Sequence, residues 1–114
     1  VRMISEETPV CPLNVYGKTK AESEKEVIRA NPNSLIVRTN FFGKGLDWRK
    51  SFSDSIIQAL MNEKEFSAFE DVYFTPISIP YLIQFLYEMI VLDLQGIYNL
   101  SGSDRVSKFE FAKR

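Results

Sequence analysis

Apolar and polar positions alternate between helical and extended spacing along this chain of 114 residues. Residues 15–30 are rich in Lys, Glu and Ala, with Asn14 as a helix cap before them and an Asn-Pro-Asn turn after them. Residues 34–39 (SLIVRT) form a short, mostly apolar run bounded by turn residues, which is typical of a buried parallel strand. The first part of the chain therefore predicts a helix followed by a strand.

Three further helices are predicted downstream, each from a polar cap followed by apolar residues at helical spacing. The caps are Ser51 with Asp54, Ser78 with Pro80 in the first helical turn, and Ser107 with Glu110. The residues expected to face a core are Phe52, Ile56, Ala59 and Leu60 in the first of these helices and Leu82, Ile83, Leu86, Met89 and Ile90 in the second.

Short extended segments lie between these helices, at residues 65–69, 72–75 and 96–100. Helices that alternate with strands of this length favour an α/β architecture with parallel pairing. The aromatic residues of this part of the chain are expected to supply core area, and they are Phe66, Phe69, Tyr73, Phe85 and Tyr87.

Composition is that of a globular protein, with 45% apolar residues, 25% charged residues and a net charge of -1. The balanced charge gives no case for nucleic acid or an anionic membrane as a partner. Apolar stretches are interrupted well short of a spanning helix and no signal pattern is seen, so a cytoplasmic protein is predicted. The charged residues expected to form a solvated helix face are Glu22, Glu24, Lys25 and Glu26.

Histidine is absent, and Cys11 is the single cysteine. A chain without histidine cannot build a Ser-His or Cys-His nucleophilic site or a His-ligated metal site, and one cysteine cannot form an internal disulfide. We therefore predict no metal site. Acid or base chemistry must be carried out by tyrosine, lysine or a carboxylate.

Tyr16 and Lys20 are the candidate acid/base pair, because residues four positions apart lie on one face of a helix. A phenol with an intrinsic pKa of about 10 exchanges its proton slowly at neutral pH, and a nearby ammonium group lowers that pKa by stabilising the phenolate. Such a pair can hand a proton to a carbonyl oxygen when the carbonyl receives hydride. The alternative is a partly buried surface pair without a catalytic role.

The sequence around this pair, SEETPVCPLNVYGKTKAESEK followed by SLIVRTNFFG, resembles the extended short-chain dehydrogenase/reductase superfamily, and within it the dTDP-4-dehydrorhamnose reductase family. The resemblance continues through DVYFTPISIPYL and GIYNLSGSDRVSKFEFA, which are similar to the family's C-terminal portion. It implies the C-terminal part of a Rossmann-like fold with alternating helices and parallel strands. Residues 1–43 would belong to the dinucleotide-binding domain and residues 44–114 to a small substrate-binding region.

A Gly-rich turn that lets the backbone approach a pyrophosphate should open a protein of this kind, and this chain has none. Gly43 and Gly45 make a single G-x-G, and Trp48 stands where a third glycine would be needed. We therefore expect a fragment that lacks the cofactor loop and is inactive by itself.

The resemblance implies that Tyr16 is the general acid and that Lys20 also hydrogen-bonds the nicotinamide ribose of NADP or NAD. Family members use a Ser or Thr to orient the substrate carbonyl, and that residue would lie before Val1. Thr8 does not match it, because it is too close in sequence to Tyr16.

Three residues, Thr39, Asn40 and Phe41, follow the end of a predicted parallel strand, where open α/β sheets bind ligands. The resemblance implies that their backbone groups approach the nicotinamide amide. The alternative is that Phe41 and Phe42 fill the core.

Substrate contacts are predicted at Arg49, Lys50 and Thr75. Arg49 and Lys50 follow Trp48, and an aromatic ring with two cations suits a nucleoside base and its diphosphate, although a solvated loop is the alternative. Thr75, in the sequence Phe-Thr-Pro, matches a family position at the floor of the substrate cleft. Pro76 also has a purely structural use before a helix.

The resemblance implies an oxidoreductase that reduces the 4-keto group of a nucleotide-linked deoxysugar with NADPH or NADH. One alternative is a non-catalytic relative similar to the regulatory subunit of methionine adenosyltransferase, whose partner would be the catalytic subunit. Another is a nucleotide-sugar epimerase or dehydratase of the same superfamily, and a third is a structural or interaction module. A homodimer is left open.

Overall fold

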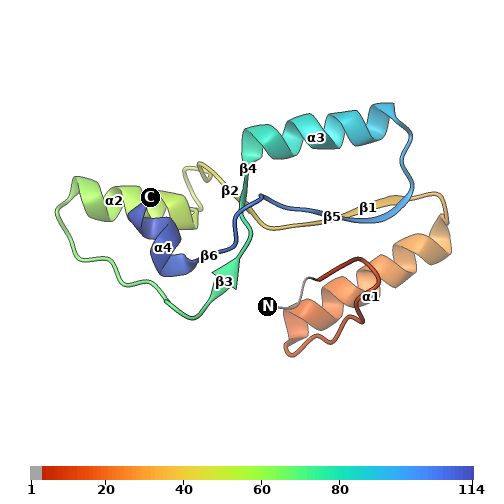
Figure 1. The fold of residues 1–114 in the computed structure, drawn as a ribbon, viewed down its shortest axis with the longest axis horizontal. Coiled ribbons are helices and arrows are strands. Elements are labelled where there is room, and N and C mark those ends of the chain that lie inside the picture. The colour runs from red at the N-terminus through yellow and green to blue at the C-terminus, as the bar shows by residue number, and fades with distance from the viewer. Residues whose placement is uncertain (1–3) are drawn as a thin grey trace. The chain divides into compact units, whose positions relative to one another are not determined.

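The structure is a computed structural model that describes residues 4–114. Its elements are α1 (Val15–Ala30), β1 (Leu35–Thr39), β2 (Phe41–Phe42), α2 (Phe52–Met61), β3 (Tyr73–Phe74), β4 (Ile77–Ser78), α3 (Ile79–Val91), β5 (Gly96–Leu100), β6 (Val106–Ser107) and α4 (Lys108–Lys113) (Figure 1). Helices and strands alternate along the chain, which confirms the predicted α/β order.

The chain divides into two compact units, Val1–Arg38 with Met89–Asn99 and Thr39–Glu88 with Leu100–Arg114. We refer to them as the first unit and the second unit. The predicted domain division after residue 43 concerns a larger protein and stays a prediction.

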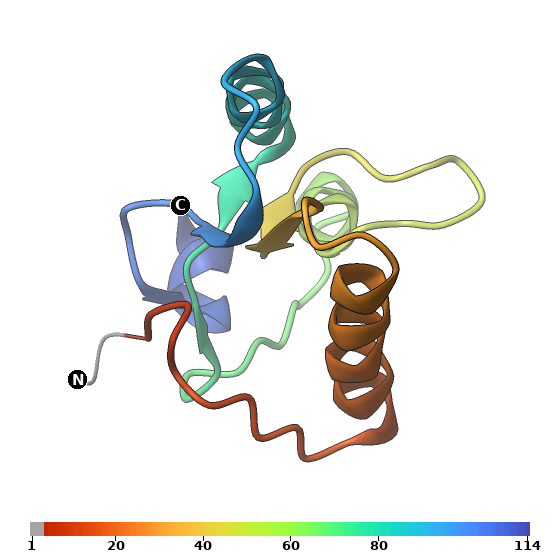
Figure 2. The ribbon, with the colours of Figure 1, turned by 90° about the vertical axis from the view of Figure 1, so that its right-hand side faces the viewer.

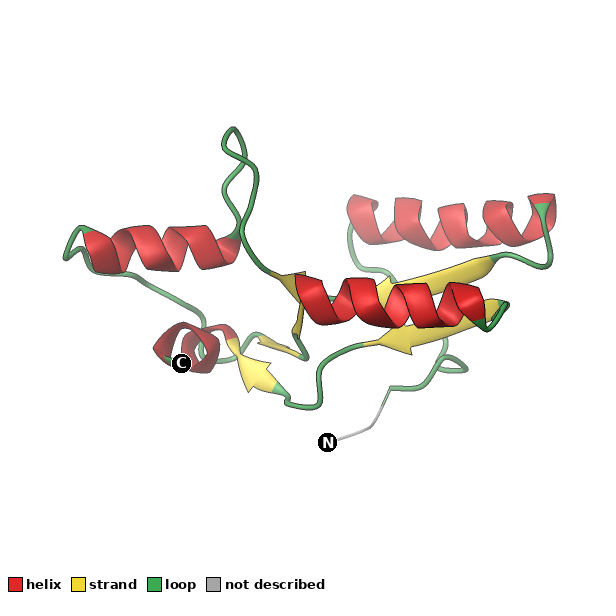
Figure 3. Cartoon of the chain, turned by 90° about the horizontal axis from the view of Figure 1, so that it is seen from above, coloured by secondary structure: helices red, strands yellow, loops and turns green. Residues whose placement is uncertain are grey.

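The first unit contains α1 and the pairing of β1 with β5. An irregular segment leads into α1 (Figure 2), and the Asn14 side chain caps the helix by accepting a hydrogen bond from the Gly17 N–H at 2.7 Å. Both strands run in the same direction (Figure 3), and the Gly96 N–H donates to the Ser34 carbonyl at 2.9 Å. The predicted helix, its cap and the strand at residues 96–100 are confirmed.

The second unit contains two short strand pairs. β2 pairs with β4 in parallel, with Phe41 opposite Ile77, and β3 pairs antiparallel with β6, with Phe74 opposite Val106. The buried apolar residues of this unit are Phe74, Ile77, Leu82 and Val106. Next to them, the Phe111 ring packs against the rings of Phe42, Phe52 and Phe74, with centroids 4.9, 6.0 and 5.4 Å away.

Capping boxes start α2 and α4 as predicted, with Ser51 and Asp54 in one and Ser107 and Glu110 in the other. Each serine oxygen accepts from a backbone N–H of the first turn, and each carboxylate accepts from the N–H of its serine. These reciprocal bonds satisfy donors that the first turn of a helix leaves unpaired.

Several residues expected in the core are exposed. They are Leu60 in α2, Ile83 and Ile90 in α3, and the aromatic residues Phe66, Phe69, Tyr73, Phe85 and Tyr87. The apolar residues of α3 occupy more than one face, but only Leu82 and Met89 are buried, with Leu86 half-buried. Periodicity identifies the apolar positions of a helix, but burial depends on which of them meet a neighbouring element. Residues 65–69, predicted as extended, pair with no strand among residues 4–114.

Candidate functional site

Tyr16 and Lys20 lie in the first two turns of α1, on the same face, as predicted. The Lys20 Nζ atom is 5.7 Å from the centroid of the Tyr16 ring, within the range of a cation–π contact. Both side chains are exposed, with 73% of the Tyr16 surface accessible to solvent. A phenol and an ammonium group are therefore held close together and open to a ligand.

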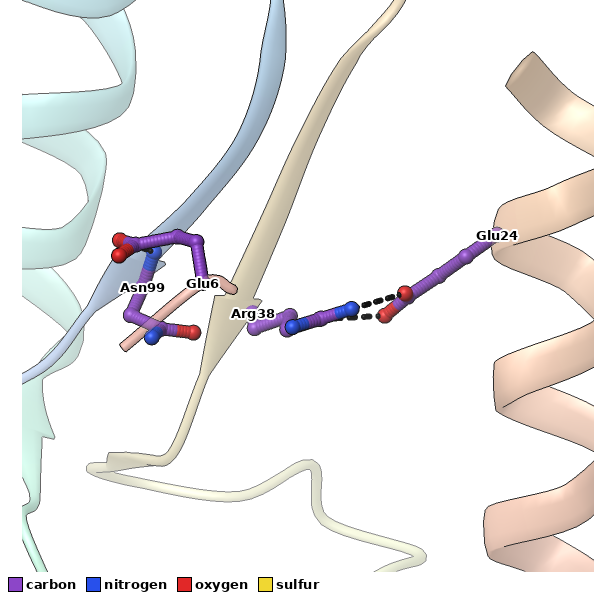
Figure 4. A network of polar contacts seen from close by, with 4 residues as sticks. All are labelled: Glu6, Glu24, Arg38 and Asn99. Atoms are coloured by element: carbon purple, nitrogen blue, oxygen red, sulfur yellow. Dashed lines mark hydrogen bonds and ion pairs between the residues drawn. The ribbon is translucent and has the colours of Figure 1, made fainter. Parts of the chain in front are cut away.

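The Arg38 side chain in β1 ties α1 to the strand. Its Nε and Nη2 atoms donate to the two carboxylate oxygens of Glu24 at 2.9 and 2.6 Å (Figure 4). The hydrogen bonds from Arg38 hold the pKa of the Glu24 carboxyl below its usual value. On the other side, Glu6 accepts from the Asn99 N–H at 2.7 Å, and this backbone hydrogen bond is the main cause of the lowered pKa of Glu6.

The expectation that Glu24 belongs to a solvated face was wrong, because this carboxylate is half-buried against Arg38. The other charged residues of the face are exposed, and they pair locally as Glu22 with Lys25 and Glu26 with Arg29. The sequence signal for the missed pair was Arg38 itself. A guanidinium group in an otherwise apolar strand needs a carboxylate partner.

The predicted cofactor residues Thr39, Asn40 and Phe41 belong to the second unit. Thr39 and Asn40 are exposed, and the Asn40 carbonyl accepts from the Ile77 N–H at 3.0 Å. Phe41 is 57% exposed, so it does not fill the core, whereas Phe42 packs edge-on against Phe111.

Thr75 is half-buried, and its carbonyl accepts from the Gly102 N–H at 3.2 Å. The Gly102 backbone also lies close to Pro76, the residue after Thr75. A Cβ atom added at Gly102 would lie only 2.1 Å from the Pro76 carbonyl oxygen. Glycine permits this close approach of two backbones. Asn40 and Thr75 thus flank the Pro76–Ile77 backbone, which brings the predicted cofactor and substrate segments of the second unit together.

A cavity of about 940 Å³ lies in the second unit, and its lining is mainly apolar. Side chains of α2, α3 and α4 form much of the wall, and the turn at residues 101–104 adds polar groups. Among its lining residues are Ile56, Tyr81, Phe85 and Phe111. Arg49 and Lys50 do not line this cavity.

The loop with Arg49 and Lys50 is exposed. The Lys50 Nζ atom donates to the Gln58 side chain at 2.6 Å and borders a separate cavity of about 240 Å³ with Asp47 and Asp54. Backbone hydrogen bonds, first from Ser51 and then from Gly45, lower the pKa of Asp54, and the nearby Lys44 charge acts in the same direction. Lys50, one of the two cations predicted to bind a diphosphate, therefore borders this cavity together with two carboxylates, Asp47 of the loop and Asp54 of α2.

Lys108 is a residue that sequence reasoning missed. Its Nζ atom lies 3.6 Å from the Phe74 ring centroid and 4.7 Å from that of Phe52. Burial lowers the pKa of this ammonium group. Lys108 also lines a cavity of about 130 Å³ with Phe41 and Phe42, so a cation with reduced hydration borders the predicted cofactor segment.

Residues 4–114 contain neither a candidate membrane-spanning helix nor a candidate metal-binding cluster. Within that range, no helix combines the length and apolar content needed to cross a membrane. His, Cys, Asp and Glu side chains in the same range form no group of three or more that could hold a metal ion.

Comparison with known proteins identifies the family. Residues 2–114 match the family described as the RmlD substrate binding domain. The dTDP-4-dehydrorhamnose reductase of Sinorhizobium fredii is 29% identical over 115 residues, which are 95% of this chain and 38% of the relative. A crystal structure of a dTDP-4-dehydrorhamnose reductase from Clostridium acetobutylicum has a TM-score of 0.87 at 28% identity, covering 99% of this chain and 39% of that one.

A third similar protein is the dTDP-4-dehydrorhamnose reductase of Bacillus anthracis, whose crystal structure is in complex with NADP. It has a TM-score of 0.80 at 30% identity and covers 90% of this chain and 36% of that chain. The class defined by fold and sequence is therefore that of α/β proteins with an RmlD-type substrate-binding domain. The chain belongs to the dTDP-4-dehydrorhamnose reductase family, as the resemblance implied, and spans 38% of the Sinorhizobium relative.

Proposed function

We propose that this chain carries the proton-donating pair and part of the substrate-binding region of an NAD(P)H-dependent reductase. The reductase acts on the 4-keto group of a nucleotide-linked deoxysugar. The observation that carries the proposal is the exposed Tyr16–Lys20 pair on α1, in a chain whose family members are named as dTDP-4-dehydrorhamnose reductases.

In this reaction the carbonyl carbon gains hydride and the carbonyl oxygen gains a proton, which together give the alcohol. The nicotinamide cofactor supplies the hydride when it is bound. The Tyr16 hydroxyl donates the proton, and the Lys20 charge stabilises the phenolate that remains. Lys20 is long enough to hydrogen-bond the nicotinamide ribose as well. The exposed, shared face of the two side chains fits both roles.

The second unit supplies further contacts in this proposal. Backbone groups of Thr39, Asn40 and Phe41 would approach the nicotinamide amide, and the exposure of these residues, from the end of β1 to the start of β2, supports this role. Thr75 lies at the floor of the substrate cleft, next to the Pro76–Ile77 backbone that also contacts Asn40. NADP is the favoured cofactor, because one similar reductase was solved in complex with it.

A diphosphate role for Arg49 and Lys50 is the weakest part of the proposal. Lys50 is engaged by Gln58, and Asp47 and Asp54 border the same cavity. The regulatory alternative, with a methionine adenosyltransferase as partner, has no support among the relatives described above, which are named as reductases.

The test of the proton donor is Tyr16→Phe in the reductase that contains this chain. We expect kcat with a 4-keto-sugar nucleotide to fall by a factor of roughly 10² to 10⁴, because the change removes a general acid. Binding of NADPH should stay nearly unchanged. The matched control is Tyr87→Phe, which removes the hydroxyl of another exposed tyrosine on a helix and should leave kcat unaltered. Wild-type kcat in the Tyr16→Phe enzyme would contradict the proposal.

The isolated chain of 114 residues should bind no dinucleotide at micromolar concentration. It lacks a Gly-rich turn, and a few polar contacts cannot offset the entropy lost on immobilising a ligand of this size. Titration of NADPH while its fluorescence is followed measures this directly. Saturable micromolar binding would show that the cofactor site lies largely within this chain.

A further inference from the structure

A two-bond side-chain contact in the first unit joins the helix that carries Tyr16 and Lys20 to strand β1. It is the two-bond pair of Glu24 and Arg38, whose side chains are 22% and 25% exposed (Figure 4). A planar guanidinium group that binds both oxygens of one carboxylate fixes the direction of approach as well as the distance. This contact therefore restrains the orientation of α1.

Within this chain, apolar packing contributes little to restraining the same helix. No residue of α1 is buried, and two of the half-buried positions are the small residues Gly17 and Ala21. A cavity of about 500 Å³ borders the pair and is lined by Ala21, Ile28 and Ile97, among others. Among the contacts that this chain supplies, the Glu24–Arg38 pair therefore provides the directional restraint on rotation of α1.

Rotation of α1 would move the reacting group directly. Tyr16, Lys20 and Glu24 are spaced by four residues, so each is offset by about 40° from the one before it and the three form one oblique stripe. A phenol oxygen lies roughly 8 to 9 Å from the axis of its helix, so a turn of about 10° moves it by about 1.5 Å. A misplacement of about 1 Å is enough to cost a factor of ~100 in rate.

We propose that Glu24 and Arg38 are positioning residues, which set the rotation of α1 and so aim the Tyr16 hydroxyl and the Lys20 ammonium group at the reacting carbonyl and the cofactor. This inference rests on the proposed function. Glu6, anchored by the Asn99 N–H, adds a second negative charge near Arg38, and its attraction helps keep the guanidinium group in place.

The test uses Glu24→Gln and the milder Arg38→Lys in the reductase that contains this chain. Arg38→Lys keeps the charge but loses the two-bond geometry. We expect kcat per folded molecule to fall roughly tenfold to a hundredfold in each variant, at a temperature where circular dichroism shows wild-type helix content. The KM for the sugar nucleotide should change less than threefold, because neither residue is proposed to contact it.

A matched control and a rescue sharpen the test. Glu26→Gln breaks an exposed ion pair of the same helix, with Arg29, and should leave kcat unchanged. The charge-swapped enzyme, Glu24→Arg with Arg38→Glu, should recover at least part of the lost kcat, because it restores a two-bond pair.

Failure of this inference can be told apart from failure of the proposed function. If Tyr16→Phe abolishes turnover while Glu24→Gln and Arg38→Lys keep kcat within twofold of wild type, the positioning role is overturned and the reductase assignment stands. The same conclusion follows if both variants raise only the KM for the sugar nucleotide. If Tyr16→Phe itself retains full kcat, the proposed function fails.

Discussion

Different kinds of contact stabilise the interior of each of the two units. The second unit contains the buried apolar residues Phe74, Ile77, Leu82 and Val106 and the ring cluster around Phe111. In the first unit Met89 is the buried apolar residue among those described, and α1 is attached through the ion pair of Glu24 with Arg38. One unit is organised by apolar packing and the other by directed polar contacts.

This difference has an energetic consequence. Burial of a large apolar side chain contributes about 1.5 to 3 kcal/mol, whereas a solvent-accessible ion pair contributes about 0 to 1 kcal/mol. The second unit should therefore supply most of the chain's stability, and the first unit should open at lower free energy. The proposed proton donor lies in the less stable unit, where geometry depends on a few polar bonds.

The largest expected effect on stability is that of Phe111→Ala in the 114-residue chain. The Phe111 ring contacts three other rings, so its removal should lower the free energy of unfolding by about 2 to 4 kcal/mol, somewhat less than for a fully buried ring. Urea unfolding followed by circular dichroism measures the change. Phe69→Ala is the control, since this ring is exposed and its loss should cost less than about 0.5 kcal/mol. If both changes lowered the free energy of unfolding equally, the ring cluster around Phe111 would not be the main source of stability in the second unit.

An intermediate effect is expected at the start of α2. The Ser51 Oγ atom donates to the Gly43 carbonyl at 2.7 Å and accepts from the Asp54 N–H at 3.1 Å, so Ser51→Ala should cost about 1 to 2 kcal/mol. Ser53 offers a matched control two residues away. Its Oγ atom is buried without a hydrogen-bond partner in the described part of the chain, so Ser53→Ala should be neutral or stabilising. The reverse order of the two effects would contradict the assigned cap.

Much of this fold could be predicted because its signals are local. Asn14, Ser51 and Ser107 are residue types that favour the start of a helix. In the structure, each of these side chains accepts a hydrogen bond from the backbone N–H three positions later. The shared face of Tyr16 and Lys20 follows from helical spacing alone. Such features require only information from a few neighbouring residues.

The features that could not be predicted depend on residues far apart in the sequence. Glu24 looks like any other charge of a lysine- and glutamate-rich helix until β1 places Arg38 beside it. Ile83 and Leu82 are equally apolar, yet Leu82 is buried and Ile83 is exposed, because only one of them meets a neighbouring element. Lys108 between two rings is a third case, since its position depends on the pairing of β3 with β6.

The smallest expected effect is that of removing the Glu24–Arg38 ion pair of the first unit. In the 114-residue chain, Glu24→Gln should lower the free energy of unfolding at pH 7 by less than about 1 kcal/mol, because the pair is partly exposed to solvent. The folded-state pKa of Glu24 lies below its usual value of 4.5, so the stabilisation is present above that pH and is lost as pH falls through the folded pKa. Urea unfolding of both proteins between pH 7 and pH 3 should therefore give curves that differ at neutral pH and converge on the acidic side. A difference that persists undiminished at the acidic end would mean that the Glu24 charge does not stabilise the first unit.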